Sequence, residues 1–138
     1  MSKAHLADAL TITRLSLHVL GATIWIGGQA VMAGLVPVLR EGGSELPAKA
    51  ARVFGRLAWP AYALLLLTGF WNMGIANNSG TTWGWQFAMG LKFLAVIGAG
   101  AGAFLHTRAT TASKRGMFAG IGFLFSLIAM VLGVALAG

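Results

Sequence analysis

The sequence predicts an all-α integral membrane protein, a four-transmembrane-helix up-down bundle with both termini outside. The first observation is composition: 57% of the 138 residues are hydrophobic and 9% are charged, whereas a soluble domain carries roughly 25% charged residues to wet its surface. The second is that four apolar stretches approach the roughly 20 residues that a helix needs to cross about 30 Å of hydrocarbon. The third is an uneven distribution of basic residues around these stretches.

The four spans form one domain over residues 1–138 and follow one another at about 15–39, 57–73, 83–105 and 116–138. Short connections between them favour antiparallel neighbours. Pro60 lies near the start of the second span, where a missing N–H costs least. Before it, Lys49, Arg52 and Arg56 recur at spacings of three and four, which predicts an amphipathic turn or two in the membrane interface. Residues 74–82 are uncharged and rich in turn-forming types, so we expect a loop there.

Basic residues indicate the orientation. Seven lie in the segments that follow the first and third spans, and two lie on the other side: Arg40, Lys49, Arg52, Arg56, Arg108, Lys114 and Arg115, against Lys3 and Arg14. Cytoplasmic segments carry the excess of Lys and Arg, so we expect a multi-pass protein of a bacterial inner membrane with its termini outside. The net charge of +7 then reflects topology and attraction to anionic lipid, and no nucleic-acid partner is expected.

Several kinds of chemistry are disfavoured by what the chain lacks. It has no Cys, which excludes disulfides, thiolate metal sites and iron–sulfur clusters. Its only acidic residues, Asp8, Glu41 and Glu45, lie outside the spans, so paired carboxylates and an intramembrane Ser-His-Asp triad are missing. The remaining classes are redox chemistry on a bound cofactor, binding or passage of a soft metal, and a helper subunit without chemistry.

One face of the first span combines a polar head with small and aromatic residues. Steps of three and four from His18 reach Gly21, Trp25, Gly28 and Met32, with Gln29 beside them. Glycine lets another backbone or a flat ligand approach closely. His18, Gly21, Trp25 and Gly28 are therefore candidate cofactor-binding residues, and helix packing is the alternative. Gln29 and Met32 are secondary candidates that could line a path inward.

Lys92 interrupts the third span. It lies about 9 Å below the outer boundary, at about 1.5 Å per residue, and a Lys at a helix centre costs ~2.5–3.5 kcal/mol to insert. We expect it to face a cavity, a partner or an anionic ligand, unless its ammonium group extends to the headgroups. Lys92 is therefore a further candidate cofactor-binding residue. His106 lies about 21 Å away at the inner end of this span and is a secondary candidate.

A metal site is expected at the outer side of the bundle. Antiparallel packing brings Met73, at the outer end of the second span, to the level of His18 and Met89. Imidazole with thioether suits copper, and it also suits haem iron held by His and Met. We therefore expect His18, Met73 and Met89 as metal ligands, with each Met taken alone more often a packing residue. No catalytic residue is predicted.

Several short motifs carry a resemblance to a known family. They are Leu17-His18-Val19-Leu20-Gly21-Ala22, Trp25-Ile26-Gly27-Gly28, Thr68-Gly69-Phe70, Trp83-Gly84-Trp85, Leu91-Lys92-Phe93 and His106-Thr107-Arg108. With them, residues 15–135 resemble the membrane domain of the copper-resistance D (CopD) family. The resemblance implies a protein that binds copper at the outer face and passes it inward or to a partner. That family typically has Asn where His106 stands, so no family role transfers to His106.

More distantly, the histidine of the first span and the lysine of the third are similar to those of the HemJ-type protoporphyrinogen oxidase family. This resemblance implies a b-type haem with His18 as axial ligand and with Lys92 at a propionate or at the porphyrin substrate. The chain departs from that family in having no second histidine soon after the lysine.

Three functions are therefore expected, in this order. The first is copper binding or transport at an outer-leaflet His/Met site, without catalysis. The second is a haem b redox protein, either a porphyrin oxidase or an electron carrier; Lys92 fits it better, because a cation beside a copper path repels the metal. The third is a non-catalytic subunit of a larger membrane complex, and the glycine-rich faces are also compatible with a homodimer.

Overall fold

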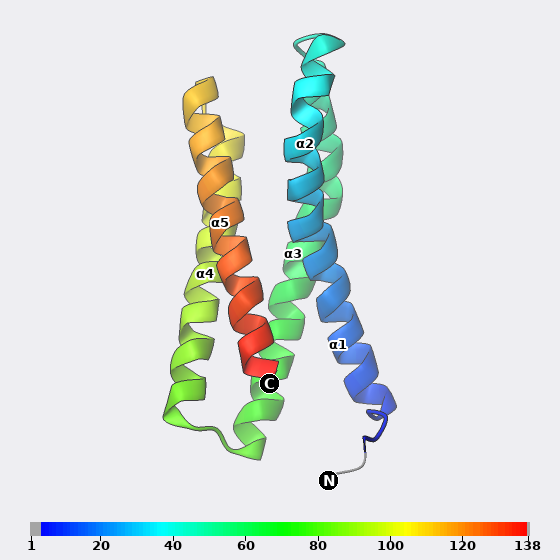
Figure 1. Cartoon of the computed structure of the whole chain (residues 1–138), viewed down its shortest axis with the longest axis vertical. Helices are drawn as coiled ribbons and strands as arrows, with labels where there is room; N and C mark the ends of the chain where they lie inside the picture. Colours follow the sequence, from blue (N-terminus) through cyan, green and yellow to red (C-terminus); the bar gives the residue numbers. More distant parts are fainter. Residues whose placement is uncertain (1–3, 138) are drawn as a thin grey trace. The chain divides into compact units, whose positions relative to one another are not determined.

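The computed structural model describes residues 4–137, apart from the side chains of residues 78 and 79. Its elements follow one another as α1 (Ala9–Ala22), η1 (Thr23–Gly27), α2 (Gly28–Glu41), α3 (Leu46–Ser79), α4 (Trp83–Arg108) and α5 (Ala112–Ala137) (Figure 1). No strand occurs among the described residues. The predicted all-helical class is confirmed, and four helical segments are long and apolar enough to cross a membrane, as an integral multi-pass protein requires.

The chain divides into two compact units, Met1–Ser79 and Gly80–Gly138. In the first, α1, η1 and α2 continue one another over Ala9–Glu41, a run of 33 residues, and α3 returns beside them (Figure 1). In the second, α4 and α5 pack against each other as an antiparallel pair (Figure 1). Each unit is thus a helical hairpin, the local form of the up-down arrangement that short connections predict.

The first helix begins earlier than the predicted span. Asp8 caps it: one carboxylate oxygen accepts from the backbone N–H of Thr11 at 3.0 Å, and the other accepts from the Thr11 hydroxyl at 2.8 Å. These two donors lower the pKa of Asp8 below its ordinary value because they stabilise the charged form. The predicted span begins at residue 15, so the early start brings Arg14 into the helix; the side of the membrane on which Arg14 lies stays a prediction. Arg14 lies inside α1 and is only 8% exposed.

The third helix also differs from its predicted span. It runs without interruption from Leu46, so the basic segment is the first part of a 34-residue helix rather than a separate interfacial turn. Pro60 consequently lies well inside the helix; membrane helices tolerate such a proline because their surroundings satisfy the freed carbonyl. At its other end the helix continues to Ser79, and the predicted loop shrinks to a connection around Gly80, whose φ of +81° suits glycine.

Small residues allow the two helices of the second unit to approach closely. A Cβ atom added to Gly102 of α4 would lie 2.7 Å from the Cα of Gly122 on α5. A Cβ added to Gly98 would lie 3.0 Å from the ring of Phe125. The hydroxyl of Ser126, which is 2% exposed, donates to the Gly122 carbonyl at 2.9 Å. The small residues of α4 and α5 therefore serve helix packing.

Candidate functional site

A hydrogen bond holds His18 of α1 against α3. His18 Nδ1 lies 2.7 Å from the hydroxyl oxygen of Thr68, which is 3% exposed. The Thr68 hydroxyl donates its single proton to the Leu64 carbonyl at 2.7 Å, so it accepts from His18. His18 therefore carries a proton on Nδ1. This is the tautomer that a metal-binding histidine adopts when a neighbouring oxygen orients it.

The His18 ring lies beside a glycine of α3. Its Cε1 is 3.9 Å from the position that a Cβ of Gly69 would take. Met73 follows Gly69 by one helical turn, and Cα–Cβ bonds in a helix tilt toward its N-terminus. The half-buried Met73 side chain therefore leaves α3 in the direction of Gly69. Of the predicted metal ligands, His18 and Met73 are the two in the first unit, and the Met73 side chain leaves α3 toward the glycine beside the His18 ring.

A second polar contact joins the same two helices one turn away. The guanidinium of Arg14, four residues before His18, donates through Nη1 to the side-chain oxygen of Asn72, four residues after Thr68. Arg14 Nε is buried and has no hydrogen-bond partner. Sequence reasoning missed this residue as part of a site. The signal was present, because a spacing of four places Arg14 on the helix face that carries His18.

The glycines of the predicted cofactor face contact α3. A Cβ on Gly21 would lie 3.0 Å from the Ala61 carbonyl oxygen, and one on Gly28 would lie 2.2 Å from the ring of Phe54. Close helix packing, the alternative reading of these glycines, therefore accounts for both. A macrocycle on this face remains a prediction, and this packing does not support it.

Trp25 belongs to an aromatic cluster rather than to an open surface. It is 3% exposed, and its ring centroid lies 5.5 Å from that of Trp59 and 4.7 Å from that of Tyr62. The ring centroids of Trp59 and Tyr62 are 5.7 Å apart and their planes are nearly perpendicular, at 83°. Aromatic pairs favour this edge-to-face geometry. The cluster packs the π-helical turn η1, in the middle of the Ala9–Glu41 helix, against α3.

Gln29 and Met32, the secondary candidates of the first unit, lie in α2. The side-chain nitrogen of Gln29 is buried without a hydrogen-bond partner, and Met32 is half-buried in α2. An unsatisfied buried amide is costly, and this orphaned donor is a feature that the sequence alone does not reveal. The inward path through these residues stays a prediction.

In the second unit, Lys92 lies across α5. Its Nζ is 3.2 Å from the position that a Cβ of Gly133 would occupy, so the glycine makes room for the ammonium group. Met89, one turn before Lys92, is 9% exposed and belongs to the core of this hairpin. The predicted grouping of these residues with His18 and Met73 joins residues of the two units, and it stays a prediction.

His106 has a structural contact at the end of α4. Its Nδ1 donates to the backbone carbonyl of Arg115 at 2.9 Å, which ties the two helices together beside their connection. At the opposite end, Trp85 Nε1 donates to the Leu136 carbonyl at 3.4 Å. The hairpin is thus tied at both ends, and this contact explains His106 without a ligand.

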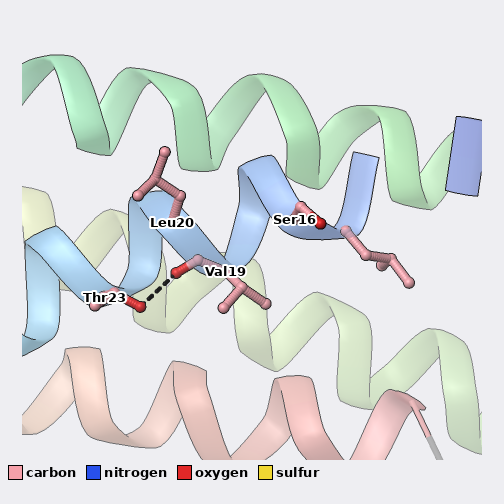
Figure 2. A pocket seen from close by; sticks show the side chains of 5 residues that line it. Ser16, Val19, Leu20 and Thr23 are labelled. Atoms are coloured by element: carbon pink, nitrogen blue, oxygen red, sulfur yellow. Dashed lines mark hydrogen bonds between the residues drawn. The ribbon is translucent and has the colours of Figure 1, made fainter. Parts of the chain in front are cut away.

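A hollow lies on α1 and η1 (Figure 2). It is lined by Leu15, Ser16, Val19, Leu20 and Thr23. The Thr23 hydroxyl donates to the Val19 carbonyl at 2.8 Å (Figure 2). The hollow contains no titratable group and none of the predicted site residues, so it adds nothing to the candidate site.

Over residues 4–137, no three His, Asp or Glu side chains converge in a way that could hold a metal ion. A metal at His18 would therefore need thioether or external ligands. Comparison with protein-family models, with curated proteins and with solved structures finds no match to this chain.

Proposed function

We propose that this chain is a membrane protein that binds copper through His18 and Met73, in the manner that its resemblance to the CopD family implies. The observation that carries the proposal is the His18–Thr68 hydrogen bond at 2.7 Å. Because Thr68 accepts the Nδ1 proton, its hydroxyl fixes the orientation of the imidazole, as the partners of metal-binding histidines do.

The donor set fits a soft metal ion better than a hard one. Imidazole and thioether are ligands that suit copper, whereas Mg²⁺ and Ca²⁺ require oxygen ligands. Met73 follows Gly69 on the side of α3 that lies near the His18 ring. In this proposal the chain holds or passes the ion and carries out no bond-making step.

The experiment is a copper measurement on the purified full chain in detergent, with matched histidine variants. We expect stoichiometric Cu(I) in the wild type, loss of binding in His18→Ala and retention in His106→Ala, because His106 bonds to the Arg115 carbonyl. Met73→Leu should weaken binding, and Met117→Leu, at a residue 51% exposed on α5, should not. Equal copper binding by wild type and His18→Ala would contradict the proposal.

A second candidate function is haem b binding with His18 as axial ligand, and a specific observation favours it. The buried guanidinium of Arg14 lies one turn from His18. A fixed cation repels a copper ion but attracts the propionates of a haem. Bound haem would supply one-electron redox chemistry, with Arg14 as a candidate partner of its carboxylates.

The absorption spectrum of the same preparation separates the two candidates. Haem gives a Soret band that shifts or disappears in His18→Ala, whereas a copper protein without haem has none. Colourless, metal-free protein would contradict both candidates and leave the third function, a non-catalytic subunit.

A further inference from the structure

Arg14 is a buried cation for which the chain supplies no carboxylate side chain. The whole sequence contains only three acidic residues. Asp8 is already engaged as the cap of α1 by two hydrogen bonds from Thr11. Glu41 and Glu45 lie at the opposite end of the first hairpin, where α2 leads into α3. Among the described residues, Arg14 therefore has no carboxylate partner, and an anionic group from another molecule is a candidate partner for it.

The local contacts solvate this cation only in part. Arg14 is 8% exposed, and its single recorded hydrogen bond goes to the neutral side-chain oxygen of Asn72. Its Nε is buried with no partner. Burying a charge is costly unless it is paired. An arginine retained at such a site is therefore prepared for an anionic partner, and a guanidinium edge matches the two oxygens of a carboxylate or phosphate.

We infer that Arg14 and Asn72 form a binding site for an oxyanion group, a carboxylate or a phosphate, at the end of the α1–α3 hairpin opposite the connection between α2 and α3. The end of the hairpin is close, because α1 begins at Ala9 and Arg14 lies in its second turn. An anion located at the membrane surface can reach the guanidinium from this end. In this site Asn72 accepts from Nη1, and the other Nη N–H groups of Arg14 donate to the anion.

The inference goes beyond metal binding at His18 and does not require it. The same chemistry has two sources in a membrane: the phosphate of a phospholipid headgroup and the propionate of a porphyrin. With a copper ion at His18, a bound phosphate would also offset the repulsion between Arg14 and the ion.

The test uses the full chain in detergent with Arg14→Met and, as matched control, Arg52→Met, which removes an exposed arginine of α3. The probes are phosphatidylglycerol, measured by native mass spectrometry, and hemin with its dimethyl ester, measured by absorption. We expect Arg14→Met to weaken the binding of either phosphatidylglycerol or hemin by about 10- to 100-fold. Arg52→Met should leave the binding of both probes unchanged. Loss of phosphatidylglycerol binding assigns a lipid phosphate. Loss of hemin binding without loss of ester binding assigns a propionate.

Thermal unfolding supplies a readout that a merely structural role would not give. Without ligand, Arg14→Met should unfold at a higher temperature than the wild type, because an apolar side chain removes the cost of the buried charge. Added ligand should raise the unfolding temperature of the wild type alone. The inference is overturned if neither probe binds the wild type, if both bind Arg14→Met equally well, or if Arg14→Met only lowers stability. His18→Ala decides the proposed function separately, through its loss of metal.

Discussion

At the scale of single residues, two polar contacts between α1 and α3 define the candidate site. His18 pairs with Thr68, and Arg14 pairs with Asn72 one turn away. Polar side chains inside an apolar hairpin are costly and tend to mark function. The alternative role, holding the two helices together, predicts a loss of stability rather than a loss of ligand when either contact is removed.

Thr68→Val tests the first contact. It keeps the shape of the side chain but removes the oxygen that accepts the Nδ1 proton of His18. Because such orienting partners tune the ligand, we expect metal affinity to fall by about 10- to 100-fold. Metal titration of the purified chain measures the effect. Thr23→Val is the matched control, since the Thr23 hydroxyl bonds only to the carbonyl of Val19. An unchanged affinity in Thr68→Val would show that His18 needs no orienting partner.

The sequence identified His18 but not Arg14 as a site residue, and the reason is physical. A histidine inside a predicted span is a candidate site residue on whichever helix face it lies. An arginine at the edge of a span is instead interpreted as a charge that flanks the membrane. Only the early start of α1 at Ala9, set by the Asp8 cap, places Arg14 inside the helix. A single capping interaction, which hydropathy does not measure, therefore changed the interpretation of a charged residue.

At the scale of helices, existence was predictable and boundaries were not. Hydropathy locates the four spans because each needs enough apolar residues to cross the hydrocarbon. It does not reveal that the basic segment before Pro60 belongs to the same helix as the second span. Long basic side chains can extend from a helix end to water, so their charge does not end the helix. The connection around Gly80 is likewise shorter than its composition suggests.

Gly102→Ala tests the packing of α4 on α5. The new methyl group would lie 2.7 Å from a backbone atom of Gly122, so the helices must separate. Overpacking of this kind typically costs about 1–3 kcal/mol. Gly120→Ala on α5 is the matched control, because nothing lies within 4 Å of its added Cβ. Denaturant unfolding in detergent compares the two. Equal stability of both variants would contradict the close approach of these helices.

At the scale of the whole molecule, the distribution of charge predicts the orientation in the membrane. Seven of the ten basic residues lie within residues 40–56 and 108–115. Segments with such an excess of Lys and Arg tend to stay in the cytoplasm, so the predicted orientation has both of them inside.

Cysteine labelling tests the orientation cleanly because the chain has no native Cys. A membrane-impermeant maleimide should label a cysteine appended after Gly138 in intact cells. It should label Thr110→Cys, an exposed position between α4 and α5, only after permeabilisation. The reverse pattern would place the basic segments outside and contradict the predicted topology.

The five-residue π-helical turn η1 interrupts the first rod at Thr23–Gly27. A π turn contains one residue more than an α-helical turn, so this stretch carries one inserted residue relative to a regular α-helix. Deleting a residue from this stretch converts it to ordinary α-helix and keeps the segments before and after it in phase. The same deletion elsewhere in the rod would rotate everything beyond it by about 100°. The Ala9–Glu41 helix can therefore lose one residue at this position while the segments on both sides of η1 still face α3.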